Sequence, residues 1–358
     1  MSGIRGSRGA RGNAAGWALF ACACAGAMAV AAGSSRRADA AGGRYAVVDT
    51  IHLGGEGGWD YLTADGGRLY FGRSTRVQVL DLKTGKLAGE IPDTPGIHGV
   101  ALAPDLGKGF TSNGRDSSVT VFDLETLAPT GRIRIGARNP DAILYEPVTH
   151  RVFTMNGGSG SATAIEGATG KIVGNVALGG RPEFAVVDGR GRVFVNLEDS
   201  SAVVAFDAKT LALGPRWPLA PGEGPTGLAI DTANHVLFSV CGNGKMIVLD
   251  AGSGRVLATL PIGNRTDGAA FDPMTKLAFS SNGEGTLTVV REDSPTKFTV
   301  VDTVATRVGA RTLALDLKTH RIYTATAGFG EMPAATPERP RPRPPMLPES
   351  FVILVLDR

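Results

Sequence analysis

The sequence has little cysteine, and this shortage excludes several kinds of stabilisation and chemistry. Only three cysteines occur in 358 residues, namely Cys22, Cys24 and Cys241. The first two lie in an amino-terminal leader, so Cys241 would be alone in the mature chain and could form no internal disulfide. The sequence also contains no CxxC, CxxCH or HExxH motif, which argues against structural zinc, covalent haem and zinc-protease chemistry. The fold must therefore depend on its hydrophobic core.

The chain also lacks a clear charge excess once its first 40 residues are set aside. Its formal net charge is +3, but residues 1–40 carry five arginines and one aspartate, so the remainder carries −1. A near-neutral domain has no general electrostatic reason to bind nucleic acid or an anionic membrane. We therefore expect no nucleic-acid partner, although Arg339, Arg341 and Arg343 form one short basic strip.

Residues 1–40 have the pattern of a signal peptide. Three arginines precede the apolar run 14–32, and residues 38–40, Ala-Asp-Ala, have the small-x-small form of a cleavage site. A transmembrane anchor is the alternative, but two glycines interrupt the alanine-rich run. Leu19–Cys22 also has a weak likeness to a lipoprotein cleavage box. We expect a periplasmic or secreted protein without a transmembrane segment in its mature chain, and the choice between a soluble and a lipid-anchored form stays open.

No segment has a convincing period of 3.6 residues, so we expect almost no helix. The chain has instead a strand-like phrase, Val77–Lys86, which returns at spacings of 41 to 43 residues as far as an insertion near the carboxyl end. Its further copies are Val119–Thr126, Ala162–Lys171, Val203–Thr210, Met246–Gly254, Leu287–Ser294 and, after the insertion, Val352–Asp357. A fixed period near 42 with strand patterning predicts a β-propeller with one four-stranded blade per repeat.

The repeats predict seven blades closed into a ring, in a single all-β domain over residues 41–358. The innermost strands should open near Tyr61, Gly99, Ala142, Phe184, Gly227, Gly268 and Thr312. The last blade has only three strands of its own. Tyr45–His52 reads like the outer strands of other blades, so we expect the amino end to supply the fourth strand and close the ring.

An insertion over residues 328–349, here called the arm, interrupts the last blade between its second and third strands. Its seven prolines argue against helix and strand and favour extended polyproline II. The arm is either a mobile surface loop or a lid or docking element for a partner.

Within the sixth repeat, the stretch Leu277–Val290 (Leu-Ala-Phe-Ser-Ser-Asn-Gly-Glu-Gly-Thr-Leu-Thr-Val-Val) resembles the "YVTN" propeller repeat. The chain as a whole, over Tyr45–Arg358, resembles the YncE-like exported propeller proteins of bacteria. That resemblance implies the fold but little about function, since relatives include surface-layer proteins, a periplasmic protein that binds DNA and, more distantly, propeller lactonases. The resemblance supplies no catalytic motif that could be matched to residues of this sequence.

The residue just before each innermost strand should point toward the propeller axis, at the end of the channel that we call the channel mouth. Aligning the seven repeats gives the ring Asp60, His98, Asp141, Glu183, Thr226, Asp267 and Arg311. Carboxylates with His98 could hold a divalent cation, with Asp141, Glu183 and Asp267 as candidate ligands, or do acid–base work, while Arg311 could bind an anionic group. The alternative is a water-filled channel whose polar residues are simply solvated.

Other candidate residues have simpler interpretations. Trp59 could stack a ligand at the mouth or serve in packing. Asparagines at the ends of second strands (Asn113, Asn156, Asn282) and aspartates after third strands (Asp81, Asp123, Asp207, Asp250, Asp357) fit turn-forming roles. Cys241 replaces one such asparagine, and we expect it to be inert unless exposed.

Two functions of different classes fit these features. The first is an exported binding protein, expected to be a monomer, whose channel face binds a small molecule or an envelope protein. The second is a metal-assisted, lactonase-like hydrolase with its site at the same mouth. The acids are spread over four blades rather than gathered on one side, which favours binding. Whether the protein is an enzyme therefore stays open.

Overall fold

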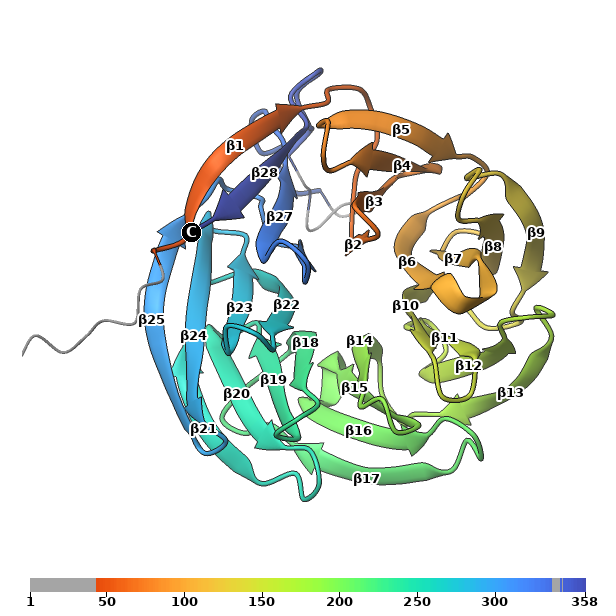
Figure 1. Ribbon diagram of the computed structural model, residues 1–358, viewed down its shortest axis with the longest axis vertical. Coiled ribbons are helices and arrows are strands. Elements are labelled where there is room, and N and C mark those ends of the chain that lie inside the picture. Colours follow the sequence, from red (N-terminus) through yellow and green to blue (C-terminus); the bar gives the residue numbers. More distant parts are fainter. Residues whose placement is uncertain (1–42, 337–341, 343) are drawn as a thin grey trace, which may run out of the picture. The chain divides into compact units, whose positions relative to one another are not determined.

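Seven four-stranded antiparallel sheets are arranged in a ring, so the chain is a seven-bladed β-propeller (Figure 1). The computed structural model describes residues 43–336, 342 and 344–358. The described part contains only two helical segments, the short 3-10 turns η1 (Pro104–Leu106) and η2 (Glu198–Ser200). The predicted fold class and the expected scarcity of helix are therefore confirmed. The predicted leader and the basic strip Arg339, Arg341 and Arg343 lie outside the described residues.

Each blade runs from an innermost to an outermost strand. Blade 1 contains β2 (Leu62–Asp65), β3 (Arg68–Arg73), β4 (Arg76–Asp81) and β5 (Lys86–Ile91), blade 2 contains β6 (Ile97–Ala103), β7 (Lys108–Asn113), β8 (Ser118–Asp123) and β9 (Pro129–Arg134), and blade 3 contains β10 (Pro140–Glu146), β11 (Arg151–Asn156), β12 (Ser161–Glu166) and β13 (Ile172–Ala177). Blade 4 contains β14 (Pro182–Val187), β15 (Arg192–Leu197), β16 (Ala202–Asp207) and β17 (Leu213–Pro218), and blade 5 contains β18 (Pro225–Asp231), β19 (Val236–Cys241), β20 (Lys245–Asp250) and β21 (Val256–Pro261). Blade 6 contains β22 (Thr266–Asp272), β23 (Leu277–Asn282), β24 (Thr286–Ser294) and β25 (Lys297–Ala305), and blade 7 contains β26 (Leu313–Asp316), β27 (Arg321–Thr326), β28 (Val352–Asp357) and β1 (Ala46–His52).

Strand β1 closes the ring as the sequence predicted. It pairs antiparallel with β28, in a register that runs from Ala46 opposite Asp357 to His52 opposite Val352, and so completes blade 7. Figure 1 shows β1 lying outside β28 beside the carboxyl end. Pairing with β1 satisfies the backbone N–H and C=O groups along one side of β28, which would otherwise form an open sheet edge.

The core consists of apolar layers between neighbouring blades. The third residue of every second strand is aromatic and buried, and these residues are Tyr70, Phe110, Phe153, Phe194, Phe238, Phe279 and Tyr323. Aromatic side chains bury more apolar area than any others, so one per blade supplies a large share of the packing between blades. The repeat in the sequence is thus a repeat of core positions.

The turns after the third strands are built as the sequence predicted in four of five cases. Asp81, for example, accepts hydrogen bonds from the amides of Lys83 and Thr84 and from the Thr84 hydroxyl. Asp123, Asp207 and Asp250 form the same contacts in their blades. Asp357 differs, because its carboxylate instead forms an ion pair with Arg321 at 2.8 Å.

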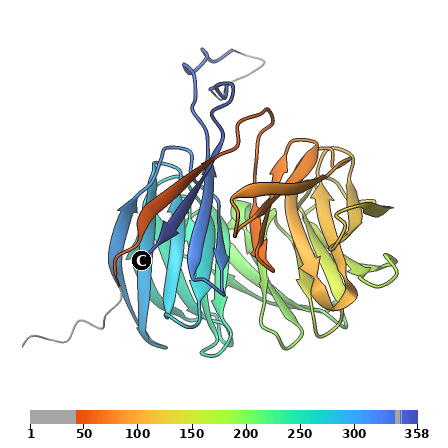
Figure 2. The same cartoon turned by 45° about the horizontal axis from the view of Figure 1, so that its top comes forward.

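The arm leaves blade 7 between β27 and β28 and stands away from one face of the ring (Figure 2). Its base is more regular than its prolines suggested, because Phe329 and Met346 form an antiparallel bridge. Gly330 donates to the Pro345 carbonyl at 2.8 Å, and Leu347 donates to that of Gly328 at the same distance. The proline-rich middle of the arm lies largely outside the described residues.

No helix among the described residues is both long and apolar enough to cross a membrane.

Candidate functional site at the channel mouth

The seven aligned residues all lie at the starts of innermost strands. Five are the second residue of β6, β10, β14, β18 or β22, and the other two, Asp60 and Arg311, lie two residues before β2 and β26. Figure 1 shows these innermost strands surrounding one axis. Contacts between blades then join five of the seven side chains into one charged group, which we describe below. Glu183 lies near enough to this group for the charges of Asp141 and Asp267 to raise its pKa. Thr226 does not join the group, because its hydroxyl donates to the Thr266 carbonyl at 3.1 Å and so links blades 5 and 6.

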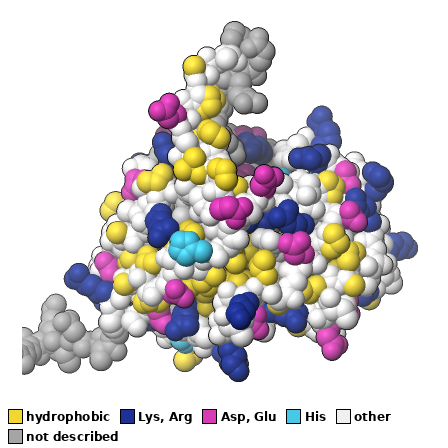
Figure 3. Space-filling model, turned by 90° about the horizontal axis from the view of Figure 1, so that it is seen from above, with side chains coloured by type: hydrophobic (Ala, Val, Ile, Leu, Met, Phe, Trp, Pro, Cys, Tyr) yellow, Lys and Arg dark blue, Asp and Glu magenta, His cyan; other side chains and the backbone are white. Residues whose placement is uncertain are grey.

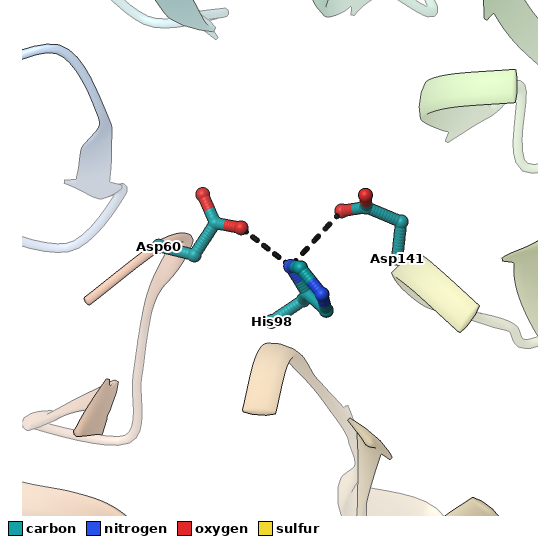
Figure 4. A group of neighbouring side chains, drawn as sticks. All are labelled: Asp60, His98 and Asp141. Carbon is teal, nitrogen blue, oxygen red and sulfur yellow. Dashed lines mark hydrogen bonds and ion pairs between the residues drawn. The ribbon is translucent and has the colours of Figure 1, made fainter. Parts of the chain in front are cut away.

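Asp60, His98 and Asp141 form the most compact part of the group (Figure 4). His98 Nδ1 lies 2.6 Å from Asp60 Oδ2 and 3.5 Å from Asp141 Oδ1. Ionised carboxylates only accept hydrogen bonds, so His98 Nδ1 keeps its proton and donates a hydrogen bond to Asp60 Oδ2. Asp141 is buried, and its Oδ1 atom has no hydrogen-bond partner among the described residues. One imidazole therefore holds two carboxylates from the blades on either side of it.

The His98 ring fits because the neighbouring residue is Gly114. A Cβ atom at this position would lie 2.6 Å from His98 Nε2 and 2.8 Å from Asn139 Oδ1. Any larger residue would displace the imidazole or the amide. The Asn113-Gly114 pair was predicted only as a turn, and the turn thus also makes room for the site.

Arg311 joins the opposite side of the mouth to this trio. Its Nε atom lies 2.8 Å from Asp267 Oδ2, and its Nη2 atom lies 3.4 Å from Asp60 Oδ1. The guanidinium thus neutralises two carboxylates of blades 1 and 6. Arg311 is therefore less available to an external anion than the sequence suggested.

Glu183 has a weaker partner. It lies 3.7 Å from Arg181, whose guanidinium is closer to Glu198, at 2.8 Å. Burial, together with the charges of Asp141 and Asp267, raises the pKa of Glu183 to about 8. Glu183 is thus the acid of the mouth that is most readily protonated at neutral pH.

Raised pKa values also occur at Asp141, Asp267, His98 and Tyr61. Burial raises the pKa of Asp141 to about 6 and that of Asp267 to about 7, against the lowering effects of His98 and Arg311 respectively. Burial lowers the pKa of His98, but its hydrogen bond to Asp60 and the charge of Asp141 outweigh burial, so the net shift is upward. Burial also raises the pKa of Tyr61 well above its usual value, and Asp141 adds to that shift. Groups perturbed by burial and by specific charges gather at functional sites.

The best candidate cation ligands are Asp60, His98 and Asp141, whose ligand atoms all lie within 4.8 Å of one another. The sequence suggested a different set, Asp141, Glu183 and Asp267. Only Asp141 belongs to both, because Asp267 and Glu183 lie outside the compact trio. Asp267 also pairs with Arg311 at 2.8 Å, closer than the 3.4 Å between Arg311 and Asp60. A bound cation would replace the Nδ1 proton of His98, because an imidazole nitrogen binds a metal only after losing its proton. One imidazole nitrogen with two carboxylate oxygens suits Mn²⁺ or Zn²⁺ better than Ca²⁺, which takes oxygen ligands only.

Trp59 serves in packing and also faces a pocket. Its ring lies 5.1 Å from that of Phe351 and 6.3 Å from that of Phe329, measured between centroids. It also lines a pocket of about 380 Å³ at the base of the arm. Both interpretations of this residue thus have a structural counterpart, and ligand stacking stays a prediction.

Sequence reasoning missed Arg73, which holds the segment before Trp59 and Asp60. The side chain is fully buried and donates to the carbonyls of Gly54, Gly55 and Gly57 at 2.8 to 3.1 Å. It also lies 3.9 Å above the Phe351 ring. Burial, together with the charge of Arg76, lowers its pKa to about 10. The available signal was its position, since an arginine stands in blade 1 where three other blades have asparagine.

Cys241 occupies the same position in blade 5 and is buried. Burial raises the pKa of its thiol to about 12. The thiolate needed for oxidation or nucleophilic attack is therefore scarce at neutral pH.

No protein-family model and no curated protein matches this chain. Among solved structures, hydrazine synthase from Kuenenia stuttgartiensis is similar with a TM-score of 0.66 and 17% identity, covering 76% of this chain and 94% of that one. The structure of U3-55K matches with a TM-score of 0.71 and 10% identity, over 86% of this chain and 99% of that one. The WD40 repeats of RRP9 match with a TM-score of 0.71 and 11% identity, over 87% and 98%. At such identities the likeness shows the seven-bladed propeller fold alone.

Proposed function

We propose that this chain is a binding protein that uses the channel mouth to hold a small molecule or a segment of a partner protein. The observation that carries the proposal is the Asp60–His98–Asp141 trio, with a buried carboxylate oxygen of Asp141 lacking a hydrogen-bond partner. Buried charges destabilise a fold unless they are paired, and a bound cation or cationic group would complete this set. Propellers with WD40 repeats, to which this fold is similar, commonly bind partners, which supports the same class of function.

The proposal includes export and a relation to the YncE-like propellers. Its support is the leader pattern of residues 1–40 and the repeat phrase of Leu277–Val290. Cleavage after Ala40 would place the domain in the periplasm or outside the cell. Amino-terminal sequencing of the protein recovered from an expressing bacterium tests this, and a retained leader would contradict it.

The test of the mouth is a metal-binding measurement on purified protein. Elemental analysis is followed by thermal melts with Mn²⁺, Zn²⁺ and Ca²⁺ for the wild type and for Asp141→Asn. We expect Mn²⁺ or Zn²⁺ to raise the melting temperature of the wild type and to have little effect on the variant, since binding to the native state stabilises it. Asp105→Asn is the matched control, because Asp105 and His150 form a similar pair at 2.8 Å that is exposed. Equal responses in all three proteins would reject the trio as a cation site.

The hydrolase keeps one specific observation in its favour, which is the 2.6 Å contact between His98 and Asp60. A carboxylate that orients an imidazole is the arrangement of a general base. The same protein can be assayed with small lactones, with and without Mn²⁺ or Zn²⁺. Turnover that His98→Ala abolishes would make the hydrolase the better description, whereas no turnover in either protein leaves the binding function.

A further inference from the structure

The pocket at the base of the arm has the size and composition of a small-molecule site. Its volume of about 380 Å³ falls in the range of roughly 300–1,000 Å³ that is usual for such sites, which are mostly apolar with few polar groups. Its lining includes four large apolar side chains and two arginines, namely Trp59, Phe329, Met332, Met346, Arg265 and Arg311. None of the charged residues in its lining is an acid.

The apolar wall comes from two parts of the chain that are far apart in sequence. Trp59 lies just before β2, and the bridged pair Phe329 and Met346 forms the base of the arm. Phe329 is 37% exposed and Met332 is 62% exposed. Figure 3 shows hydrophobic side chains along the projecting arm. Exposed apolar side chains that line a concave surface mark a binding site more often than scattered ones do.

The two arginines differ in how far their charges are already neutralised. Arg311 pairs with Asp267 and Asp60. Arg265 is exposed and forms no ion pair with any described residue. Arg181 holds the equivalent position in blade 4, and there Glu198 pairs with it at 2.8 Å. Arg265 is thus a free cation at the pocket.

The reason for this difference is local. Blade 6 also has an acid after its second strand, Glu284, but its carboxylate accepts a hydrogen bond from Asn264 at 2.8 Å and another from Thr286 at 3.1 Å. Glu284 is therefore held by other partners and leaves Arg265 unpaired. An external carboxylate could form an ion pair with Arg265, as Glu198 does with Arg181.

We infer that this pocket binds a small amphipathic carboxylate, with its apolar body against Trp59, Phe329 and Met346 and its carboxylate at Arg265. The inference rests on the proposed function of the mouth and specifies a ligand class for it. Charge complementarity and the apolar lining together favour this class over a simple anion or an uncharged apolar molecule, because each of those would use only half of the pocket.

The experiment compares three probes on the purified full chain. These are 4-phenylbutyrate, its uncharged amide 4-phenylbutanamide, and acetate, which has the charge without the apolar body. Binding is followed by thermal shift and by tryptophan fluorescence. We expect saturable binding of 4-phenylbutyrate, with binding of the amide and of acetate weaker by about tenfold or more, the usual effect of losing a charged hydrogen bond or an apolar contact. Of the two tryptophans among the described residues, Trp59 and Trp217, only Trp59 lines the pocket, so Trp59→Phe should remove the fluorescence change and Trp217→Phe should keep it.

Two variant pairs separate binding from folding. Met332→Asp places a carboxylate on the rim of the pocket and should weaken binding, whereas Met274→Asp at a 77% exposed methionine in the β22–β23 turn should not. Arg265→Ala should weaken binding by about tenfold, whereas Arg255→Ala in the β20–β21 turn should leave it unchanged. All four positions are exposed, so none of these changes should unfold the domain.

Equal binding of the acid and its amide, equal effects within either pair, or no binding of 4-phenylbutyrate would overturn the inference. Such a failure is distinct from failure of the proposed function. A stabilisation by Mn²⁺ or Zn²⁺ that Asp141→Asn removes would still support the channel mouth as a binding site.

Discussion

At the residue scale, the position of each side chain along the repeat could be predicted, but its partner could not. Aligning the repeats identified Asp60, His98 and Asp141 as neighbours in the ring, and the structure brings them into contact. Arg181 and Arg265 hold equivalent positions in blades 4 and 6, two residues before Glu183 and Asp267. Glu198 pairs with Arg181, whereas Glu284, the acid near Arg265, accepts hydrogen bonds from the Asn264 amide and the Thr286 hydroxyl. Which of these partners an acid takes depends on distances that the sequence does not give.

The asparagines that end second strands show the same limit. They were predicted as turn residues, and their side chains are in fact buried. Asn282, for instance, donates to the hydroxyls of Thr286 and Thr288 at 3.0 Å and accepts from Ser280. Asn113 and Asn156 form matching networks in their blades. The asparagine therefore holds the second strand to the third, a role that requires knowing which strand faces it.

The raised pKa values of the mouth predict that the protein is less stable at alkaline pH. In the native state, the pKa values of Asp141, Glu183 and Asp267 are about 6, 8 and 7. In the unfolded state these carboxyl groups return to their ordinary pKa values of about 4. The native state thus binds more protons than the unfolded state between about pH 4 and 8, so stability falls as pH rises through this window. The upward shift of His98 acts in the same direction.

Replacing Glu183 by Gln should flatten this dependence, because glutamine does not titrate. We expect the variant to melt at a higher temperature than the wild type at pH 8.5 and to lose most of that advantage at pH 5. Thermal melts from pH 5 to 9 measure the effect, with Glu125→Gln in an exposed turn as the control. A constant difference between Glu183→Gln and the wild type at every pH would contradict the assigned shift.

At the scale of elements, the strands and the closure by β1 could be predicted because they follow from the repeat and from alternating burial. The base of the arm could not, because its prolines dominate the local pattern while the pairing of Phe329 with Met346 joins residues on either side of them. Strand pairing is a property of two segments, and a single proline-rich segment gives no sign of it.

Deleting residues 330–348 should leave the propeller folded. The deletion removes no strand of blade 7. Of the two ends that remain, Phe329 lies three residues after the end of β27, and Glu349 lies three residues before the start of β28. We expect cooperative unfolding, with the melting temperature lowered by a few degrees for the lost packing on Trp59. Circular dichroism and urea unfolding check this. A truncated protein without β-structure would mean that the arm is part of the blade.

At the scale of the whole molecule, closure of the ring brings the charged residues of the channel mouth together. Asp60 and Arg311 are 251 residues apart in the sequence and come within 3.4 Å. That convergence could be predicted from the number of repeats, since seven blades must surround one axis. The pocket at the arm could not, because it forms between the ring and an insertion that the repeat does not describe.

The closure by β1 has one more consequence, which concerns the connectivity of the chain. Gly43 and Arg358 are neighbours, since a Cβ atom on Gly43 would lie 3.3 Å from the carbonyl carbon of Arg358. A circular permutant that joins these two residues by a short glycine-serine linker and opens between Gly66 and Gly67, in the β2–β3 turn, should therefore fold into the same ring. The join between early and late chain would then move from blade 7 to blade 1. Near-identical circular dichroism spectra and retained binding at the mouth would show that the circle, rather than the order in which its blades are made, specifies this protein.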